Sequence, residues 1–298
     1  MISQESFIQW QKRVQAQMEL ILVRVLPPAQ TAPEHLHQAM RYVTLDGGKR
    51  LRPLLVFASA ELGEADQDFT EYVAAAVECI HVYSLVHDDM PEMDNDQLRR
   101  GKPTCHIAYD QATALLVGDA LQTQAFYLLS RPSKLKAEKQ LEIIQTLSHA
   151  SGSLGMAGGQ AIDLANVGKD MTQQDLEAMH SLKTGALISA AVKMGALCCK
   201  KITEEQLAYL AEYSQKLGLA FQVMDDVLDC EQDSATLGKT AGKDEEQNKP
   251  TYVKLMGLKQ ARAYADQLIE DALNVLEPFG DKAHKLRCLA RFVTHRNY

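Results

Sequence analysis

Several features that would assign this sequence to familiar classes of protein are missing from it. Its 298 residues hold 31 basic against 39 acidic side chains, so the basic excess typical of a nucleic-acid-binding protein is absent. Its most apolar stretch, residues 72–86, is interrupted by Glu78 and His81, which leaves no run of about 18 uncharged apolar residues. The N-terminus has no apolar region of the signal-peptide kind. We therefore expect a cytoplasmic protein with no nucleic-acid partner and no membrane contact.

Cysteine pairs and strand patterns are missing as well. None of the six cysteines belongs to a CxxC pair, which argues against a zinc ribbon or a thioredoxin-type site. Cys79, Cys198 and Cys288 stand among apolar neighbours and are expected to be small buried hydrophobic residues in a reducing cytoplasm. Runs that alternate β-branched with polar residues do not occur, so a sheet protein is not expected.

The sequence is instead patterned for helices nearly throughout. Ala, Leu, Glu, Gln, Lys and Met dominate it, and prolines and paired glycines separate the periodic segments. No repeat, linker or shift of composition divides the chain, which predicts a single all-α domain over residues 1–298. The expected helices cover residues 4–25, 33–46, 51–62, 69–90, 110–130, 136–150, 152–165, 172–198, 203–230, 251–277 and 282–294.

Two acidic clusters follow apolar helical segments. Residues 88–96 (DDMPEMDND) hold four aspartates and a glutamate, and Pro91 should end the preceding helix near Met90. Residues 225–229 (DDVLD) place Asp225 and Asp229 on one helix face. Carboxylates at a helix C-terminus repel each other and meet the negative end of the helix dipole, so cations should compensate them. Oxygen ligands of this kind suit Mg²⁺ bound together with a polyphosphate.

Basic residues stand close to both acidic clusters. Residues 99–102 (RRGK) follow the first, and Lys239, Lys243 and Lys249 follow the second. Residues 47–53 (GGKRLRP) combine glycines for a tight turn with arginines that can bind phosphate in a bidentate manner. Solvated loops and helix ends would explain any one of these segments alone. Their recurrence together favours a site for phosphate esters and metal ions.

The ordered set of motifs resembles the trans-isoprenyl diphosphate synthases, or trans-prenyltransferases, and most closely the bacterial farnesyl diphosphate synthases. The resemblance covers about residues 40–255 and rests on GGKRLRP, DDMPEMDNDQLRRGKPTCH, KTGAL and FQVMDDVLD, with NKPTY after them. It implies an orthogonal bundle of about ten core helices around a deep central cavity, usually in a homodimer. It also implies a reaction that joins isopentenyl diphosphate to dimethylallyl or geranyl diphosphate by ionisation, condensation and proton elimination, to give farnesyl diphosphate.

The resemblance also implies roles for residues at matching positions. About three Mg²⁺ ions, which Mn²⁺ could replace, would be held by Asp88, Asp89, Asp94, Asp225 and Asp229. The allylic diphosphate would be bound by Arg99, Lys183, Lys239 and Lys249. Isopentenyl diphosphate would be bound by Lys49, Arg52, His81 and Arg100. The catalytic set that faces the breaking bond and the developing carbocation would be Lys183, Thr184, Gln222 and Lys239.

The length of the product is expected to depend on Tyr83 and Ser84, which stand five and four residues before Asp88. In the family, an aromatic residue at the fifth position usually forms the floor of the cavity and limits the product to fifteen carbons. Ordinary core packing is the other interpretation of Tyr83.

Alternatives for the function of the whole chain are a geranylgeranyl or geranyl diphosphate synthase, a terpene cyclase, a non-catalytic partner subunit of a prenyltransferase and an acidic helical scaffold. The polar segment 231–250 is interpreted as a lid.

Overall fold

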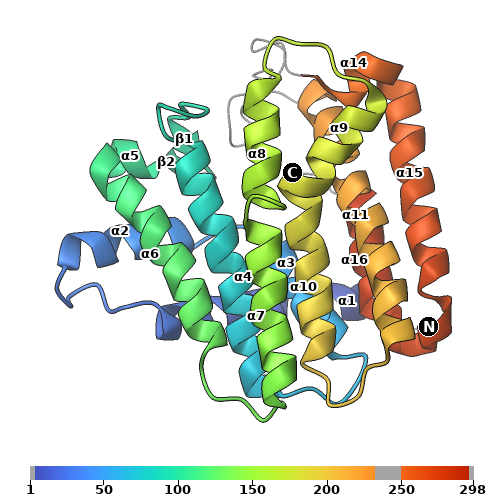
Figure 1. Cartoon of the computed structure of the whole chain (residues 1–298), viewed down its shortest axis with the longest axis horizontal. Coiled ribbons are helices and arrows are strands. Elements are labelled where there is room, and N and C mark those ends of the chain that lie inside the picture. The colour runs from blue at the N-terminus through green and yellow to red at the C-terminus, as the bar shows by residue number, and fades with distance from the viewer. Residues whose placement is uncertain (1–3, 232–249, 295–298) are drawn as a thin grey trace.

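A computed structural model describes residues 4–231 and 250–294 of the chain, and about three quarters of these residues lie in helices (Figure 1). The elements, in chain order, are α1 (Gln4–Val25), α2 (Glu34–Thr44), α3 (Leu51–Ala60), α4 (Gln67–Asp88), β1 (Leu98–Arg99), β2 (Lys102–Pro103), α5 (Cys105–Ala108), α6 (Gln111–Leu129), α7 (Ala137–Ser151), α8 (Met156–Ala165), α9 (Gln173–His180), the π-helical turn η1 (Ser181–Gly185), α10 (Ala186–Leu197), α11 (Glu204–Glu231), α14 (Tyr252–Met256), α15 (Leu258–Val275), the 3₁₀ segment η2 (Glu277–Ala283) and α16 (His284–Thr294). The prediction of an all-α fold is therefore confirmed.

The core is built around two central helices. α4 packs against both α3 and α6, and α10 packs between α3 and α11. Nine residues of the ten-residue α3 are buried, which explains why that segment is apolar on every side. Cys79 and Cys198 lie in this core as predicted, while Cys288 is only half-buried.

Side chains cap several helices where turn chemistry predicts a helix start. The Asp110 carboxylate accepts from the Thr113 N–H at 2.8 Å and begins α6. Thr172 and Thr251 cap α9 and α14 in the same way.

The boundaries differ from the predictions in three places. The single helix expected over 172–198 is wrong, because η1 interrupts it as a π-helical turn between α9 and α10. The helix expected over 251–277 is divided at Gly257, whose φ of +80° no regular helix contains. The β1–β2 hairpin was not expected; Arg100 and Gly101 both have positive φ, which matches the two-residue turn that suits a hairpin.

Within residues 4–231 and 250–294, no helix is both long enough and apolar enough to cross a membrane. Of the segment interpreted as a lid, only the two end residues, 231 and 250, are among the described residues.

Candidate active site

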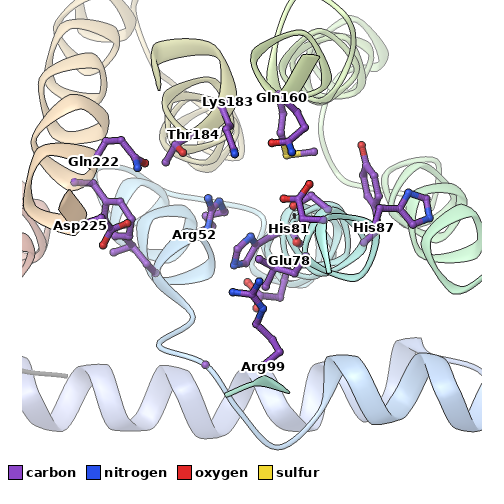
Figure 2. A pocket seen from close by; sticks show the side chains of 18 of the residues that line it. Arg52, Glu78, His81, His87, Arg99, Gln160, Lys183, Thr184, Gln222 and Asp225 are labelled. Atoms are coloured by element: carbon purple, nitrogen blue, oxygen red, sulfur yellow. Dashed lines mark hydrogen bonds between the residues drawn. The ribbon is translucent and has the colours of Figure 1, made fainter. Parts of the chain in front are cut away.

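A cavity of about 750 Å³ opens between α3, α4, α8, η1, α11 and α16, with the turn before α3 and the β1–β2 hairpin at its rim (Figure 2). These elements are distant in sequence, so the fold brings the motif residues together. The predicted site residues that line the cavity are Lys49, Arg52, His81, Tyr83, Ser84, Asp88, Arg99, Arg100, Lys183, Thr184, Gln222 and Asp225.

The remaining predicted residues lie elsewhere. Asp89, Asp94 and Asp229 are not part of the cavity wall. Asp89 is buried and accepts hydrogen bonds from the Arg99 guanidinium, whose Nε lies 3.1 Å from Asp89 Oδ1. Arg99 is thus in an ion pair with the first acidic cluster while it also reaches the cavity. Lys239 and Lys249 lie outside the described residues.

The first acidic cluster is compact because the chain turns back after α4. The Asp94 N–H donates to the backbone oxygen of Asp88 at 2.8 Å. Burial raises the pKa of Asp88 to about 6, with Asp94 and Asp89 adding to the rise and Lys183 and Arg99 opposing it. Asp88 is therefore a carboxylate for which additional positive charge would be favourable.

Two neighbouring residues of the second acidic cluster have different surroundings. Asp225 faces the cavity from α11, whereas Asp226 is buried and accepts from the Tyr252 N–H at 2.8 Å. Asp226 therefore connects α11 to α14. Within the described ranges, no three His, Cys, Asp or Glu side chains come close enough together to hold a metal ion by themselves. A cation in this cavity would need further ligands from substrate or water, as is usual for Mg²⁺.

Another part of the cavity wall is strongly basic. Burial, with a smaller effect of the neighbouring Arg100, lowers the pKa of Arg52 to about 10 against the opposing effect of Glu78 and Asp225, and Arg52 stays protonated at neutral pH. The Nε of Arg52 is buried and lacks a hydrogen-bond partner among the described residues. Burial and the cations Arg52 and Arg100 hold the pKa of His81 well below its usual value, so His81 is neutral. Such a group of donors is suited to an anion.

Arg50, which the sequence analysis did not single out, has a structural role in this basic turn. Arg50 is 3% exposed. Its guanidinium lies 2.7 Å from the Glu78 carboxylate and 2.5 Å from the Glu19 carboxylate. It also donates to the Thr44 carbonyl at 2.7 Å. Arg50 thereby joins α1, α2 and α4 at the cavity wall, which it lines together with its neighbours Lys49 and Arg52.

η1 presents the next pair of predicted residues. Lys183 and Thr184 both line the cavity from this five-residue π turn. The Lys183 ammonium lies 2.6 Å from the Asp163 carboxylate of α8. Gln222, on the neighbouring α11, faces the same region in Figure 2. The π turn is the kind of helix irregularity that often occurs at functional sites.

One wall of the cavity is apolar. Met156, Leu164, Phe221, Phe292 and Val293 contribute to it. Tyr83 also lines the cavity, and its ring meets the His87 ring edge-on with 5.8 Å between ring centroids. The His87 imidazole in turn contacts the Leu115 carbonyl of α6 at 3.1 Å. Tyr83 is therefore supported from behind by α6.

A helical bundle in which one cavity combines two acidic helix ends, a basic group and an apolar wall defines an enzyme class that acts on diphosphate esters of hydrocarbons. The sequence profile of the polyprenyl synthetase family matches residues 33–290. A farnesyl diphosphate synthase of Haemophilus influenzae is 47% identical over 264 residues, which is 88% of each chain. A geranylgeranyl diphosphate synthase of Cyanophora paradoxa is 41% identical over 267 residues, or 89% of each chain.

Solved structures agree with this assignment. A geranyltransferase from Helicobacter pylori, complexed with magnesium and isoprenyl diphosphate, superposes with a TM-score of 0.88 at 34% identity and 98% coverage of both chains. The present chain belongs to the polyprenyl synthetase family and is a prenyltransferase.

Proposed function

We propose that this prenyltransferase condenses isopentenyl diphosphate with dimethylallyl or geranyl diphosphate to make farnesyl diphosphate. The observation that carries the proposal is the convergence of Asp88 and Asp225 with Arg52, Arg100 and Lys183 on one cavity. The names of the relatives support the same substrate class, with farnesyl diphosphate favoured as product. Both acidic clusters are intact, which argues against a non-catalytic partner subunit.

The acidic residues are proposed to hold divalent metal, about three Mg²⁺ ions with Mn²⁺ as an alternative. Asp88 fits this role because its buried carboxylate faces the cavity beside other carboxylates and its pKa is raised. The proposed ligands are Asp88, Asp89, Asp94, Asp225 and Asp229. Bound metal would neutralise the diphosphate and assist its departure as a leaving group.

The protein's own cations are proposed to divide between the two substrates. Arg99 and Lys183, with Lys239 and Lys249, bind the allylic diphosphate. Isopentenyl diphosphate is bound by Lys49, Arg52, His81 and Arg100. Neutral His81 donates one ring N–H to that anion and adds no charge to the crowded arginines.

Loss of the allylic diphosphate leaves a carbocation that must be kept from water. The apolar wall excludes water, and Thr184 and Gln222 direct oxygen dipoles toward the cation without acting as nucleophiles. Condensation with the isopentenyl double bond then moves the positive charge to the new chain, and a proton must leave. We infer that the released diphosphate accepts this proton.

Tyr83 is proposed to form the floor of the cavity and Ser84 to lie beside it, which limits the product to fifteen carbons. The competing product is geranylgeranyl diphosphate, for which the floor would have to lie deeper.

A homodimer is proposed from the exposed apolar residues of α6, namely Leu115 and Leu116, which are 49% and 53% exposed. We also propose a cytoplasmic location.

A product assay tests the proposed function. Purified protein would be incubated with Mg²⁺, isopentenyl diphosphate and geranyl diphosphate, and the dephosphorylated products would be separated by chain length. A fifteen-carbon alcohol that disappears with EDTA or with Asp88→Ala is expected. A twenty-carbon alcohol would keep the chemistry and reject the Tyr83 floor, and absence of any product from folded protein would reject the enzyme assignment.

A further inference from the structure

α8 contributes to the cavity in a way that the motifs did not predict. Met156, Gln160 and Leu164 lie on its cavity side. Asp163, three residues after Gln160, is 6% exposed, and its Oδ2 lies 2.6 Å from Lys183 Nζ. α8 therefore lines the cavity and also contacts the ammonium group of Lys183, which lines the cavity from η1.

α8 is fixed against η1 by direct backbone packing. A Cβ atom placed on Gly159 would lie 2.2 Å from the Lys183 backbone nitrogen and 2.5 Å from its Cα. Because these are backbone atoms, a larger residue would force the two segments apart. Gln160 follows Gly159 directly, so this close contact also sets the position of the Gln160 side chain relative to Lys183.

The Gln160 amide is buried without a partner. Neither Oε1 nor Nε2 is accessible to solvent, and neither has a hydrogen-bond partner within residues 4–231 and 250–294. An amide has two donor hydrogens and an acceptor oxygen, and burying them unpaired costs free energy. A buried glutamine that faces a cavity in this state is poised to contact a bound molecule. Figure 2 shows its side chain projecting inward from the same side as Lys183, across from Arg52 and His81.

We propose that Gln160 donates a hydrogen bond from Nε2 to the diphosphate of the allylic substrate, and that Asp163 is a positioning residue that holds Lys183 for the same group. The inference rests on the proposed function. Asp163 accepts one of the three ammonium hydrogens of Lys183 and leaves two for the ligand. The allylic diphosphate is assigned because Lys183 is close enough to Asp88 to interact with it electrostatically, whereas His81 is grouped in the same way with Arg52 and Arg100.

The first experiment replaces the amide by an apolar side chain of similar shape, in Gln160→Met. The KM for geranyl diphosphate should rise at least about tenfold, since a hydrogen bond to a charged group is lost. The KM for isopentenyl diphosphate should stay within about twofold of wild type. The inhibition constant of inorganic diphosphate against geranyl diphosphate should rise in parallel with the KM, because the lost contact is to the diphosphate and not to the hydrocarbon.

Thermal unfolding of the same variant separates binding from structure. Removing an unsatisfied buried amide should leave the Tm of Gln160→Met unchanged or higher. Gln215→Met, the same chemical change at an exposed position of α11 away from this cavity, is the matched control and should change neither KM. An unchanged KM for geranyl diphosphate, an unchanged inhibition constant or a lower Tm in Gln160→Met would overturn the Gln160 assignment. If wild-type protein forms no product, the proposed function itself fails, independently of Gln160.

Asp163 is tested by a pair of variants. Asp163→Asn keeps an oxygen that can accept from Lys183 and should keep the KM for geranyl diphosphate within about threefold. Asp163→Ala removes the acceptor and should raise that KM about tenfold, with the KM for isopentenyl diphosphate unchanged. Equal KM values in the two variants would show that the carboxylate does not position Lys183.

Discussion

At the scale of the residue, Gly48 sets the position of an arginine from a distant hairpin. Its φ is +89°, and a Cβ at this position would lie 2.7 Å from the Arg100 Cζ. Arg100 also donates to the Gly47 carbonyl at 3.2 Å. The absence of a side chain at Gly48 therefore lets the Arg100 guanidinium lie flat over the basic turn.

Gly48→Ala should displace Arg100 and raise the KM for isopentenyl diphosphate roughly tenfold, with little change for geranyl diphosphate. Gly168→Ala is the matched control, because Gly168 has a φ of +73° and nothing within 4 Å of the added Cβ. Both variants should lose about 1 kcal/mol of stability from the left-handed backbone. Steady-state kinetics and urea unfolding measure the two effects, and equal KM values in both variants would contradict this role of Gly48.

His180 makes the stability of the protein sensitive to acid. It is 7% exposed and stacks on Tyr252 with 5.6 Å between ring centroids. Burial, together with the nearby Lys183, lowers the pKa of His180 from its usual 6.5 to about 3. Between about pH 6.5 and about pH 3, His180 is protonated in the unfolded chain but neutral in the folded chain. The free energy of unfolding therefore decreases as the pH falls through this range.

His180→Phe should remove this sensitivity, because the ring can still stack on Tyr252 and no longer titrates. Between pH 7 and pH 5, the wild type should lose about 2 kcal/mol more stability than the variant. Chemical unfolding of both proteins at the two pH values measures the difference. Parallel loss of stability in wild type and variant would mean that His180 is accessible to protons in the folded state.

Single residues also show what sequence reasoning could and could not predict. Asp88, Asp225 and Lys183 were identified because their motifs are specific, and all three face one cavity. Arg50 and Arg52 are two residues apart in one motif and both line the cavity, yet Arg50 is paired with Glu19 and Glu78 whereas the Nε of Arg52 has no hydrogen-bond partner among the described residues. No role was predicted for Gln160, because only the three-dimensional packing of α8 on η1 gives it a position.

At the scale of the element, η1 is the irregularity on which the site depends. A π turn contains one residue more than an α-helical turn would need, and this extra residue rotates the side chains around it. In η1 the rotated pair is Lys183 and Thr184, both of which line the cavity. Apolar periodicity continues through residues 172–198, which is why the sequence predicted one uninterrupted helix.

Deleting Ser181 should convert η1 into ordinary α-helix and turn Lys183 and Thr184 away from the cavity. The helical circular dichroism should be retained, because α9 and α10 remain in register. Activity should fall at least about 100-fold, the size expected when transition-state donors are lost. Ser181→Ala, a change at an exposed side chain, should keep activity within about twofold. Full activity in the deletion variant would show that the π turn is dispensable.

The hairpin shows a different limit of prediction. β1 and β2 contain two residues each, which is too short for alternation to be visible in the sequence. Arg100 occupies a turn position with a φ of +53°, where glycine or asparagine is the usual signal. The helices of the described chain could be predicted from their periodicity, whereas this turn required the structure.

At the scale of the whole molecule, α6 carries apolar side chains that the single chain leaves uncovered. Leu115 and Leu116 are both about half exposed, and Tyr127, three turns further along, is 54% exposed. α6 lies at an edge of the bundle in Figure 1. Burial of this face against a second copy would remove it from water.

We therefore expect the wild type to be a dimer and a variant with Leu115→Glu and Leu116→Glu to be monomeric. Leu20→Glu, at a position of α1 that is 73% exposed, is the control and should leave the dimer intact. Size-exclusion chromatography with light scattering would measure the mass of all three proteins. A monomeric wild type, or a dimeric α6 variant, would reject α6 as the interface.

The place of α16 in the cavity wall has a consequence for biosynthesis. Phe292 and Val293 line the cavity, and all the other residues that line it come earlier in the chain, from Gly48 onward. A ribosome releases the basic turn and both acidic clusters well before it releases α16. A nascent chain thus acquires its diphosphate-binding groups early, but water can still enter, and a carbocation formed there would be quenched. We therefore expect productive chemistry only after α16, the last described helix, has docked.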